Sequence, residues 1–224
     1  MTDVLDLIRF YPLWQAKLER HANSLADAKP WVTFAATKVL EKFLQQCEAP
    51  RVFEFGSGGS TLFFLNQGVQ VSSVEHDETW FSAVSDRIPA ALKSRWLGRL
   101  CAPELGNPGS AQDSAENPTS YLSSAADYFG MRFVDYAQAI DAFPDRYFDL
   151  VLIDGRARPS CLMHAKSKVR AGGLLVLDNS ERLHYQAARR TIDVTGSWDC
   201  SEYGGPGPYN RYFWDTTIWK RRTD

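Results

Sequence analysis

A glycine-rich loop and two acidic residues are the first features whose residue types and spacing can do chemistry. The loop runs from Glu54 to Ser60 as Glu-Phe-Gly-Ser-Gly-Gly-Ser, and Glu75 ends the next apolar run. Glycine lets the backbone approach a ligand closely and adopt positive φ, while the N-terminus of a following helix favours polar or anionic groups. A carboxylate after the next strand can accept hydrogen bonds from both ribose hydroxyls. The pattern therefore indicates a nucleoside site.

Two nucleoside cofactors compete for this loop. The dinucleotide motif G-x-G-x-x-G requires a third glycine where the sequence has Thr61, and it would bring a pyrophosphate close to the carboxylate of Glu54. A cationic amino-acid nucleoside without phosphates suits the acid better, because Glu54 can orient its ammonium, directly or through water, by charge-assisted hydrogen bonds. An NAD(P)-dependent oxidoreductase is the alternative at this point.

A second group of oxygen-bearing side chains follows two later apolar runs. Asp154 comes directly after 148–153, and Asp178 and Asn179 come after 174–177. Open α/β sheets bind ligands at the carboxyl ends of their strands, so we expect these side chains to converge. Carboxylate and amide oxygens suit Mg²⁺. Without metal, Asp154 is a candidate general base, with Asp178 and Asn179 hydrogen-bonding an acceptor; alternatively, the acids cap helices.

Three arginines lie just beyond these acids, namely Arg156, Arg158 and Arg182. A guanidinium group can receive a carboxylate or phosphate on an acceptor molecule. Arginines in such positions are more often solvated or paired with surface acids. We therefore expect the three to be surface residues rather than ligands of the acceptor.

The elements that must position these groups alternate between strands and helices. Because the strands are apolar almost throughout, we expect a parallel sheet covered on both faces. The third strand is either 95–101, which we prefer, or 131–134, and Thr216 and Ile218 suit a late antiparallel strand. The other predicted strands are 51–55, 69–74, 148–153, 174–177, 197–203 and 212–220, and the predicted helices are 4–20, 31–43, 77–93 and 134–142.

The segment from Ala102 to Ser120 breaks this alternation. It contains three prolines, two glycines and no Lys or Arg, so a packed element is not expected there. Such a loop is either disordered or folded over a site as a lid. We expect an N-terminal helical extension over 1–48, followed by an α/β domain over 49–224 with an insertion near 102–127.

These motifs resemble those of the class I S-adenosylmethionine-dependent methyltransferases. The first motif of that superfamily matches Glu54, Gly56 and Gly58, with Ser60 at its third small position, and the second matches Glu75. The resemblance implies a doubly wound, Rossmann-like sheet of seven strands, mostly parallel with an antiparallel last strand, preceded by N-terminal helices. It also implies that the methyl donor is bound by Glu54, Gly56, Ser57, Gly58, Gly59 and Glu75, with His76 beside the adenosine.

The later acids resemble those of the metal-dependent O-methyltransferases of the catechol and caffeoyl-coenzyme A type. That resemblance implies that Asp154, Asp178 and Asn179 hold Mg²⁺, which lowers the pKa of the acceptor oxygen and orients it. We expect an enzyme that methylates oxygen on a small-molecule or sugar acceptor. A non-catalytic module that keeps the cofactor fold as a binding surface is a further alternative.

Composition narrows the remaining function classes. The 25 Lys and Arg residues against 27 Asp and Glu give a net charge of −2, which offers no broad positive field for a nucleic acid. The four cysteines lie far apart, as is typical of reduced thiols in a cytoplasmic protein. No run reaches the length of a membrane span and no export signal is visible, so we expect neither a membrane nor a nucleic-acid partner.

Overall fold

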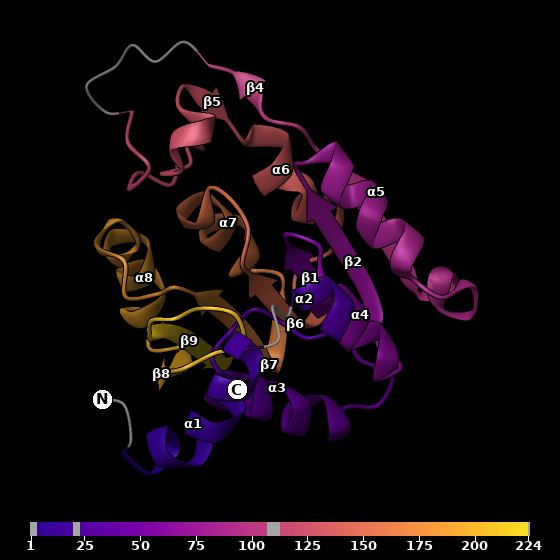
Figure 1. Cartoon of the computed structure of the whole chain (residues 1–224). Helices are drawn as coiled ribbons and strands as arrows, with labels where there is room; N and C mark the ends of the chain where they lie inside the picture. Colours follow the sequence, from indigo (N-terminus) through magenta and orange to yellow (C-terminus); the bar gives the residue numbers. More distant parts are fainter. Residues whose placement is uncertain (1–3, 20–22, 107–112, 224) are drawn as a thin grey trace.

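A seven-stranded sheet forms the centre of the computed structural model, which describes residues 4–19, 23–106 and 113–223. Helices lie on both sides of this sheet (Figure 1). In their order across the sheet, the strands are β3 (Trp96–Leu100), β2 (Gln70–Glu75), β1 (Arg51–Phe55), β6 (Phe148–Ile153), β7 (Val169–Asp178), β9 (Trp214–Arg221) and β8 (Trp198–Gly205).

Strand pairing confirms the predicted topology. β1 pairs in parallel with β2 and β6, and the parallel pairing continues to β3 on one side and β7 on the other. β9 is antiparallel to both of its neighbours, β7 and β8. The direction in which the chain builds the sheet reverses between β1 and β6. Such a switch point opens a crevice at the carboxyl ends of the strands, where open α/β sheets bind ligands.

Side chains on opposite faces of the strands build two separate cores, because successive residues of a strand point to opposite sides. Val52 and Leu150 belong to one core, and Phe53 and Val151 belong to the other. The first core is covered by α3 (Phe34–Gln45), α4 (Gly59–Asn66) and α5 (Glu78–Arg87), and the second by α6 (Val134–Gln138), α7 (Arg158–Ala165) and α8 (Gln186–Asp193).

Two further helices, α1 (Val4–Glu19) and α2 (Ser24–Asp27), precede α3. α2 packs against the start of α4 so closely that a Cβ at Gly59 would lie 2.1 Å from the carbonyl oxygen of Ser24. Only glycine fits at this contact. The N-terminal segment therefore buttresses the loop that precedes α4.

The helix predicted to reach Lys93 is shorter than expected, because α5 ends at Arg87. Pro89 restricts the residue before it to extended backbone, and Ile88 has φ −71° and ψ 121°. The chain then resumes as a 3₁₀ helix over Ala90–Arg95. The proline thus sets the point at which the chain turns toward β3.

The insertion predicted near 102–127 lies within the longer segment that joins β3 to α6, beyond the arrowhead of β2 at the top of Figure 1, and this whole segment is called the insertion below. Part of it forms an antiparallel ribbon of two short strands, β4 (Glu104–Leu105) and β5 (Met131–Arg132), so 131–132 does not belong to the central sheet. The third strand is β3, as preferred from the sequence. Residues 107–112 of the insertion lie outside the described residues. Within the described ranges, none of the helices combines the length and apolarity that crossing a bilayer requires.

Candidate active site

A cavity of about 490 Å³ lies at the carboxyl edge of the sheet, above the switch point. It is bordered by the loop after β1, by the ends of β2, β6 and β7, and by Tyr128 of the insertion. All the predicted site residues except Glu54 line it. They are Gly56, Ser57, Gly58, Gly59, Glu75, His76, Asp154, Asp178 and Asn179.

Two backbone N–H groups of the glycine loop donate hydrogen bonds to side chains of the protein. Ser57 N donates to Glu75 Oε2 at 3.0 Å, and Gly58 N donates to Thr61 Oγ1 at 2.9 Å. Gly56 has φ +96°, and a Cβ there would lie 3.1 Å from the Cα of Gly155. A pyrophosphate-binding loop needs free N–H donors. Here Thr61, which replaces the third glycine of the dinucleotide motif, occupies one of them.

Glu54 lies beneath the loop rather than in the cavity. Its carboxylate is fully buried and accepts hydrogen bonds from Ser60 Oγ at 2.7 Å and from Thr61 Oγ1. Burial raises the pKa of Glu54 to about 8, although these hydroxyls favour its ionised form. Ser60 lines the cavity, so it links the buried acid to any ligand. The sequence interpretation missed the roles of Ser60 and Thr61, which their hydroxyl groups next to a motif acid could have signalled.

Glu75 presents an ionised carboxylate to the cavity. Its Oε1 accepts from His76 N at 2.7 Å and Asp77 N at 3.1 Å, and it lies 2.6 Å from His76 Nδ1. Burial favours the neutral acid, but the contacts with His76 and Asp77 outweigh it and lower the pKa of Glu75. An ionised carboxylate can accept hydrogen bonds from both hydroxyls of a ribose.

The imidazole of His76 connects Glu75 to two other walls of the cavity. Its Nε2 lies 2.9 Å from the hydroxyl of Tyr128 and 3.3 Å from Arg156 Nε. Because arginine can only donate, Nε2 accepts from Arg156, while Nδ1 is buried close to Glu75 without the alignment of a hydrogen bond. The insertion contributes Tyr128 to this network, a contact that local sequence patterns did not indicate.

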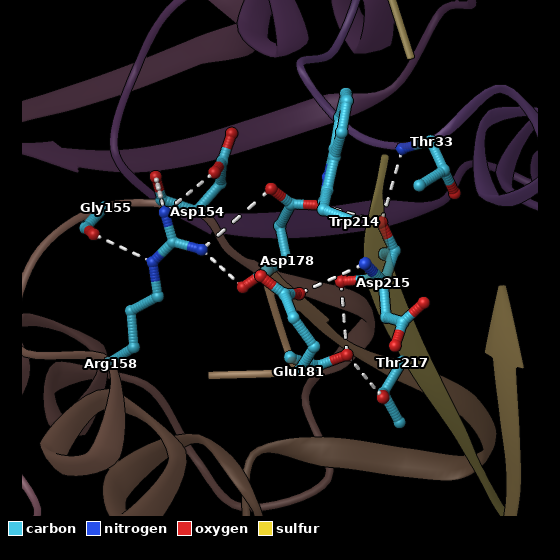
Figure 2. Close-up of polar contacts among 11 residues, drawn as sticks. Thr33, Asp154, Gly155, Arg158, Asp178, Glu181, Trp214, Asp215 and Thr217 are labelled. Carbon is cyan, nitrogen blue, oxygen red and sulfur yellow. Dashed lines mark hydrogen bonds and ion pairs between the residues drawn. The ribbon is translucent and has the colours of Figure 1, made fainter. Parts of the chain in front are cut away.

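A buried arginine lies between the two later acids (Figure 2). Arg158 Nη2 lies 3.1 Å from Asp154 Oδ1, and Nη1 lies 4.0 Å from Asp178 Oδ2. The same guanidinium donates to the carbonyl oxygens of Gly155, Asp154 and Asp178. With its side chain only 8% exposed, Arg158 is an internal residue, so the prediction that it is a surface residue is wrong.

The two acids differ in what else they contact. Asp178 Oδ1 accepts from Trp214 Nε1 at 2.8 Å and Thr216 Oγ1 at 2.7 Å, so neutral donors occupy this oxygen. Asp154 keeps 21% of its side chain exposed toward the cavity. Burial raises the pKa of both acids, and the charge of Asp178 raises that of Asp154 further, while Arg158 opposes both shifts.

This arrangement does not fit the predicted Mg²⁺ ligand set. A cation already lies between Asp154 and Asp178, since the Arg158 guanidinium contacts both carboxylates. Mg²⁺ needs an octahedron of oxygen ligands near 2 Å, and the neutral donors on Asp178 compete for the oxygens that would supply it. Among the residues the structure describes, no group of three or more His, Cys, Asp or Glu side chains is arranged to hold a metal ion.

No protein-family model and no curated protein matches the chain. Solved structures do match over nearly its whole length. A protein from Corynebacterium glutamicum superposes with a TM-score of 0.62 at 13% identity, covering 99% of both chains. An O-methyltransferase from Bacillus cereus in complex with SAH gives 0.58 at 18% identity, covering 94% of this chain and 91% of that one.

The O-methyltransferase TomG from Streptomyces achromogenes, involved in tomaymycin synthesis and solved with SAM, gives a TM-score of 0.57 at 15% identity. That match covers 92% of this chain and 90% of TomG. At these identities the similarities concern the fold. They confirm the predicted Rossmann-like sheet of seven strands, the fold of the class I methyltransferases.

Proposed function

We propose that this protein is an S-adenosylmethionine-dependent methyltransferase that acts on an oxygen atom of a small molecule. One observation carries this proposal. The nucleoside end of the cavity offers the carboxylate of Glu75, while the N–H groups of Ser57 and Gly58 are already taken by side-chain oxygens. An acidic site with few free donors suits a cationic nucleoside and disfavours a dinucleotide diphosphate.

The residues of the loop and β2 form the donor half of the site. Glu75 accepts the ribose hydroxyls, and Ser60, backed by Glu54, faces the ammonium group of the amino-acid moiety. His76 and Tyr128 border the adenosine. When bound, S-adenosylmethionine supplies an electrophilic methyl group on a sulfonium centre.

Asp154 is the proposed base for the acceptor hydroxyl. It faces the cavity, and its raised pKa makes it a better proton acceptor near neutral pH than an ordinary aspartate. The guanidinium of Arg158 forms an ion pair with the carboxylate of Asp154 and so stabilises its ionised form. We propose that this device works without a divalent cation, because the guanidinium already lies where a metal would bridge the two acids.

Isothermal titration calorimetry with S-adenosylhomocysteine and with NADH tests the proposed cofactor. We expect S-adenosylhomocysteine to bind and NADH not to bind. Glu75→Gln, which keeps the shape but removes the charge, should weaken that binding by about 10- to 100-fold, since hydrogen bonds to charged groups contribute about 1.5–3 kcal/mol. The exposed Glu48→Gln is the matched control. Binding of NADH alone would instead support the oxidoreductase alternative.

Turnover with a panel of small hydroxylated acceptors, including sugars, tests the reaction itself. Methylated product from at least one acceptor is expected, and it should depend on Asp154. Tight nucleoside binding with no product from any acceptor would support a non-catalytic binding module instead.

A further inference from the structure

A second cavity, of about 130 Å³, adjoins the larger one and shares part of its wall. Both are lined by Gly155, Arg156, Arg158 and Arg182. The rest of the smaller cavity is bordered by the N-terminus of α7, by His184 and Tyr185, and by Leu122–Ala125 of the insertion. The two cavities therefore lie next to each other at the carboxyl edge of the sheet.

Two of the shared arginines, Arg156 and Arg182, have no acid within ion-pair distance among the described residues, although the charge of Asp154 acts on both from farther away. Arg156 Nε donates to His76 Nε2 at 3.3 Å, and its guanidinium lies 5.0 Å from the ring centroid of Tyr128. Arg182 lies 6.0 Å from the ring centroid of Tyr185. Within the described part of the chain, neither guanidinium forms an ion pair. Arg158 differs from them, because it is fully engaged by carbonyls and carboxylates.

The N-terminus of α7 adds positive potential to the same cavity. Its N-cap residue is Ala157, whose side chain cannot accept a hydrogen bond, and no side-chain cap is present. Pro159 has no N–H and Cys161 N donates to the carbonyl oxygen of Ala157, so only the N–H groups of Arg158 and Ser160 lack a partner within the helix. An anion is the ligand that such a helix end favours.

His184 contributes a ring nitrogen, Nε2, that lacks a hydrogen-bond partner among the described residues. Its Nε2 is buried and has no hydrogen-bond partner in the described structure, although the residue lines the smaller cavity. Burial and the nearby charge of Arg182 lower the pKa of His184, so the imidazole is neutral and Nε2 is able to donate. The neighbouring Glu181 is engaged elsewhere, since its Oε2 accepts from Asp215 N at 3.0 Å (Figure 2).

We propose that the smaller cavity binds an anionic group, a carboxylate or a phosphate, carried by the methyl acceptor. Arg156, Arg182 and the N-terminus of α7 bind this group, and the acceptor's hydroxyl lies in the larger cavity beside Asp154. Planar guanidinium groups recognise both anions through paired N–H donors. This inference rests on the proposed methyltransferase function, because that function makes the larger cavity the place of reaction.

Inorganic phosphate is the first probe, titrated into the protein with and without S-adenosylhomocysteine. Binding is followed by calorimetry and by the NMR resonances of the four histidines. We expect the His184 resonances to shift, and Arg182→Gln to weaken phosphate binding at least tenfold. Arg190→Gln removes the same charge from an exposed position on α8 and should change affinity less than twofold. Equal losses in the two variants, or an unchanged Arg182→Gln, would overturn the proposal.

Paired acceptors test the role of the subsite in turnover. Each pair is a hydroxylated aromatic acid and its methyl ester, which differ only in the anionic group. The acid should have at least a tenfold higher kcat/KM, and Arg182→Gln should remove this preference by raising the KM of the acid. A preference that survives in Arg182→Gln would reject the subsite.

Nucleoside affinity separates this inference from the proposed function. Arg182→Gln should leave S-adenosylhomocysteine binding unchanged. If the wild-type protein binds phosphate through Arg182 but binds no S-adenosylhomocysteine, the proposed methyltransferase function fails while the anion site stands. If it binds the nucleoside and ignores phosphate, the anion site fails alone.

Discussion

The two halves of the carboxyl edge of the sheet use acids in different ways. At the tips of β1 and β2, Glu54 and Glu75 are held by hydroxyls, backbone N–H groups and an imidazole, and neither forms an ion pair with an arginine or lysine of the described ranges. At the tips of β6 and β7, Asp154 and Asp178 share the buried Arg158. In the first half only Glu75 presents an ionised carboxylate to the cavity, whereas in the second half one guanidinium group offsets part of the charge of the two acids.

Under the proposed function, this difference would let one edge of the sheet bind two ligands of opposite charge. Together with Arg158, Arg156 and Arg182 give three guanidinium groups against the two carboxylates of Asp154 and Asp178, so positive charge is in surplus on the β6–β7 side. A cationic methyl donor and an anionic acceptor would then each meet complementary charge. The division lies along the switch point between β1 and β6.

The largest expected effect is a loss of kcat on replacing Asp154, in the β6–β7 half of the site. Asp154→Asn should lower kcat by about 10²- to 10⁴-fold, because general-base catalysis contributes that much. S-adenosylhomocysteine affinity should stay within twofold of wild type, since the donor half is untouched. Steady-state kinetics and calorimetry measure both quantities, with the exposed Asp86→Asn as the control. An unchanged kcat would mean that Asp154 is not the base.

Replacing the buried Arg158 should lower the stability of the fold as well as the activity. Arg158→Met leaves two buried carboxylates without a counter-charge and should lower the free energy of unfolding by about 3–5 kcal/mol. Chemical denaturation measures this value. Arg190→Met, on the exposed face of α8, should change it by less than about 0.5 kcal/mol. If the two variants were equally stable, the charge compensation assigned to Arg158 would be wrong.

The β1–β2 half should show a pH signature that depends on Glu54. Its folded pKa is about 8 against an ordinary 4.5, so the folded protein binds the proton more tightly than the unfolded chain. Stability from this group is complete below pH 4.5 and is lost as the pH rises through about 8. Glu54→Gln should therefore gain thermal stability relative to wild type as the pH rises across this range.

The difference in Tm between the two proteins is the quantity to follow, since Asp154 and Asp178 titrate in both and cancel. Glu48→Gln, an exposed change of the same kind, should show no such trend. A pH-independent difference for Glu54→Gln would show that Glu54 is ionised in the folded protein throughout.

The smallest expected effect concerns metal. Because Arg158 contacts both later acids, removing divalent cations with a chelator should leave turnover within about twofold of its untreated value. Activity assays with EDTA, and after adding Mg²⁺ back, measure this. A loss that Mg²⁺ restores would show that the guanidinium moves aside for a metal.

The sequence predicted the features that depend on local pattern. Strand–helix alternation, the loop after β1 and the carboxylates at strand ends follow from periodicity and residue type, and the structure contains them. The role of Arg158 was not predicted, because the turn at Ala157, with φ 44°, decides which way its side chain points. Likewise, Tyr128 meets His76 only through a contact 52 positions apart, which periodicity cannot show.

That single contact ties two walls of the cavity together. The hydroxyl of Tyr128 contacts His76, and its ring lies against Arg156. One insertion residue thus borders both the Glu75 side and the Arg156 side. Any substitution at Tyr128 would therefore alter both walls at once.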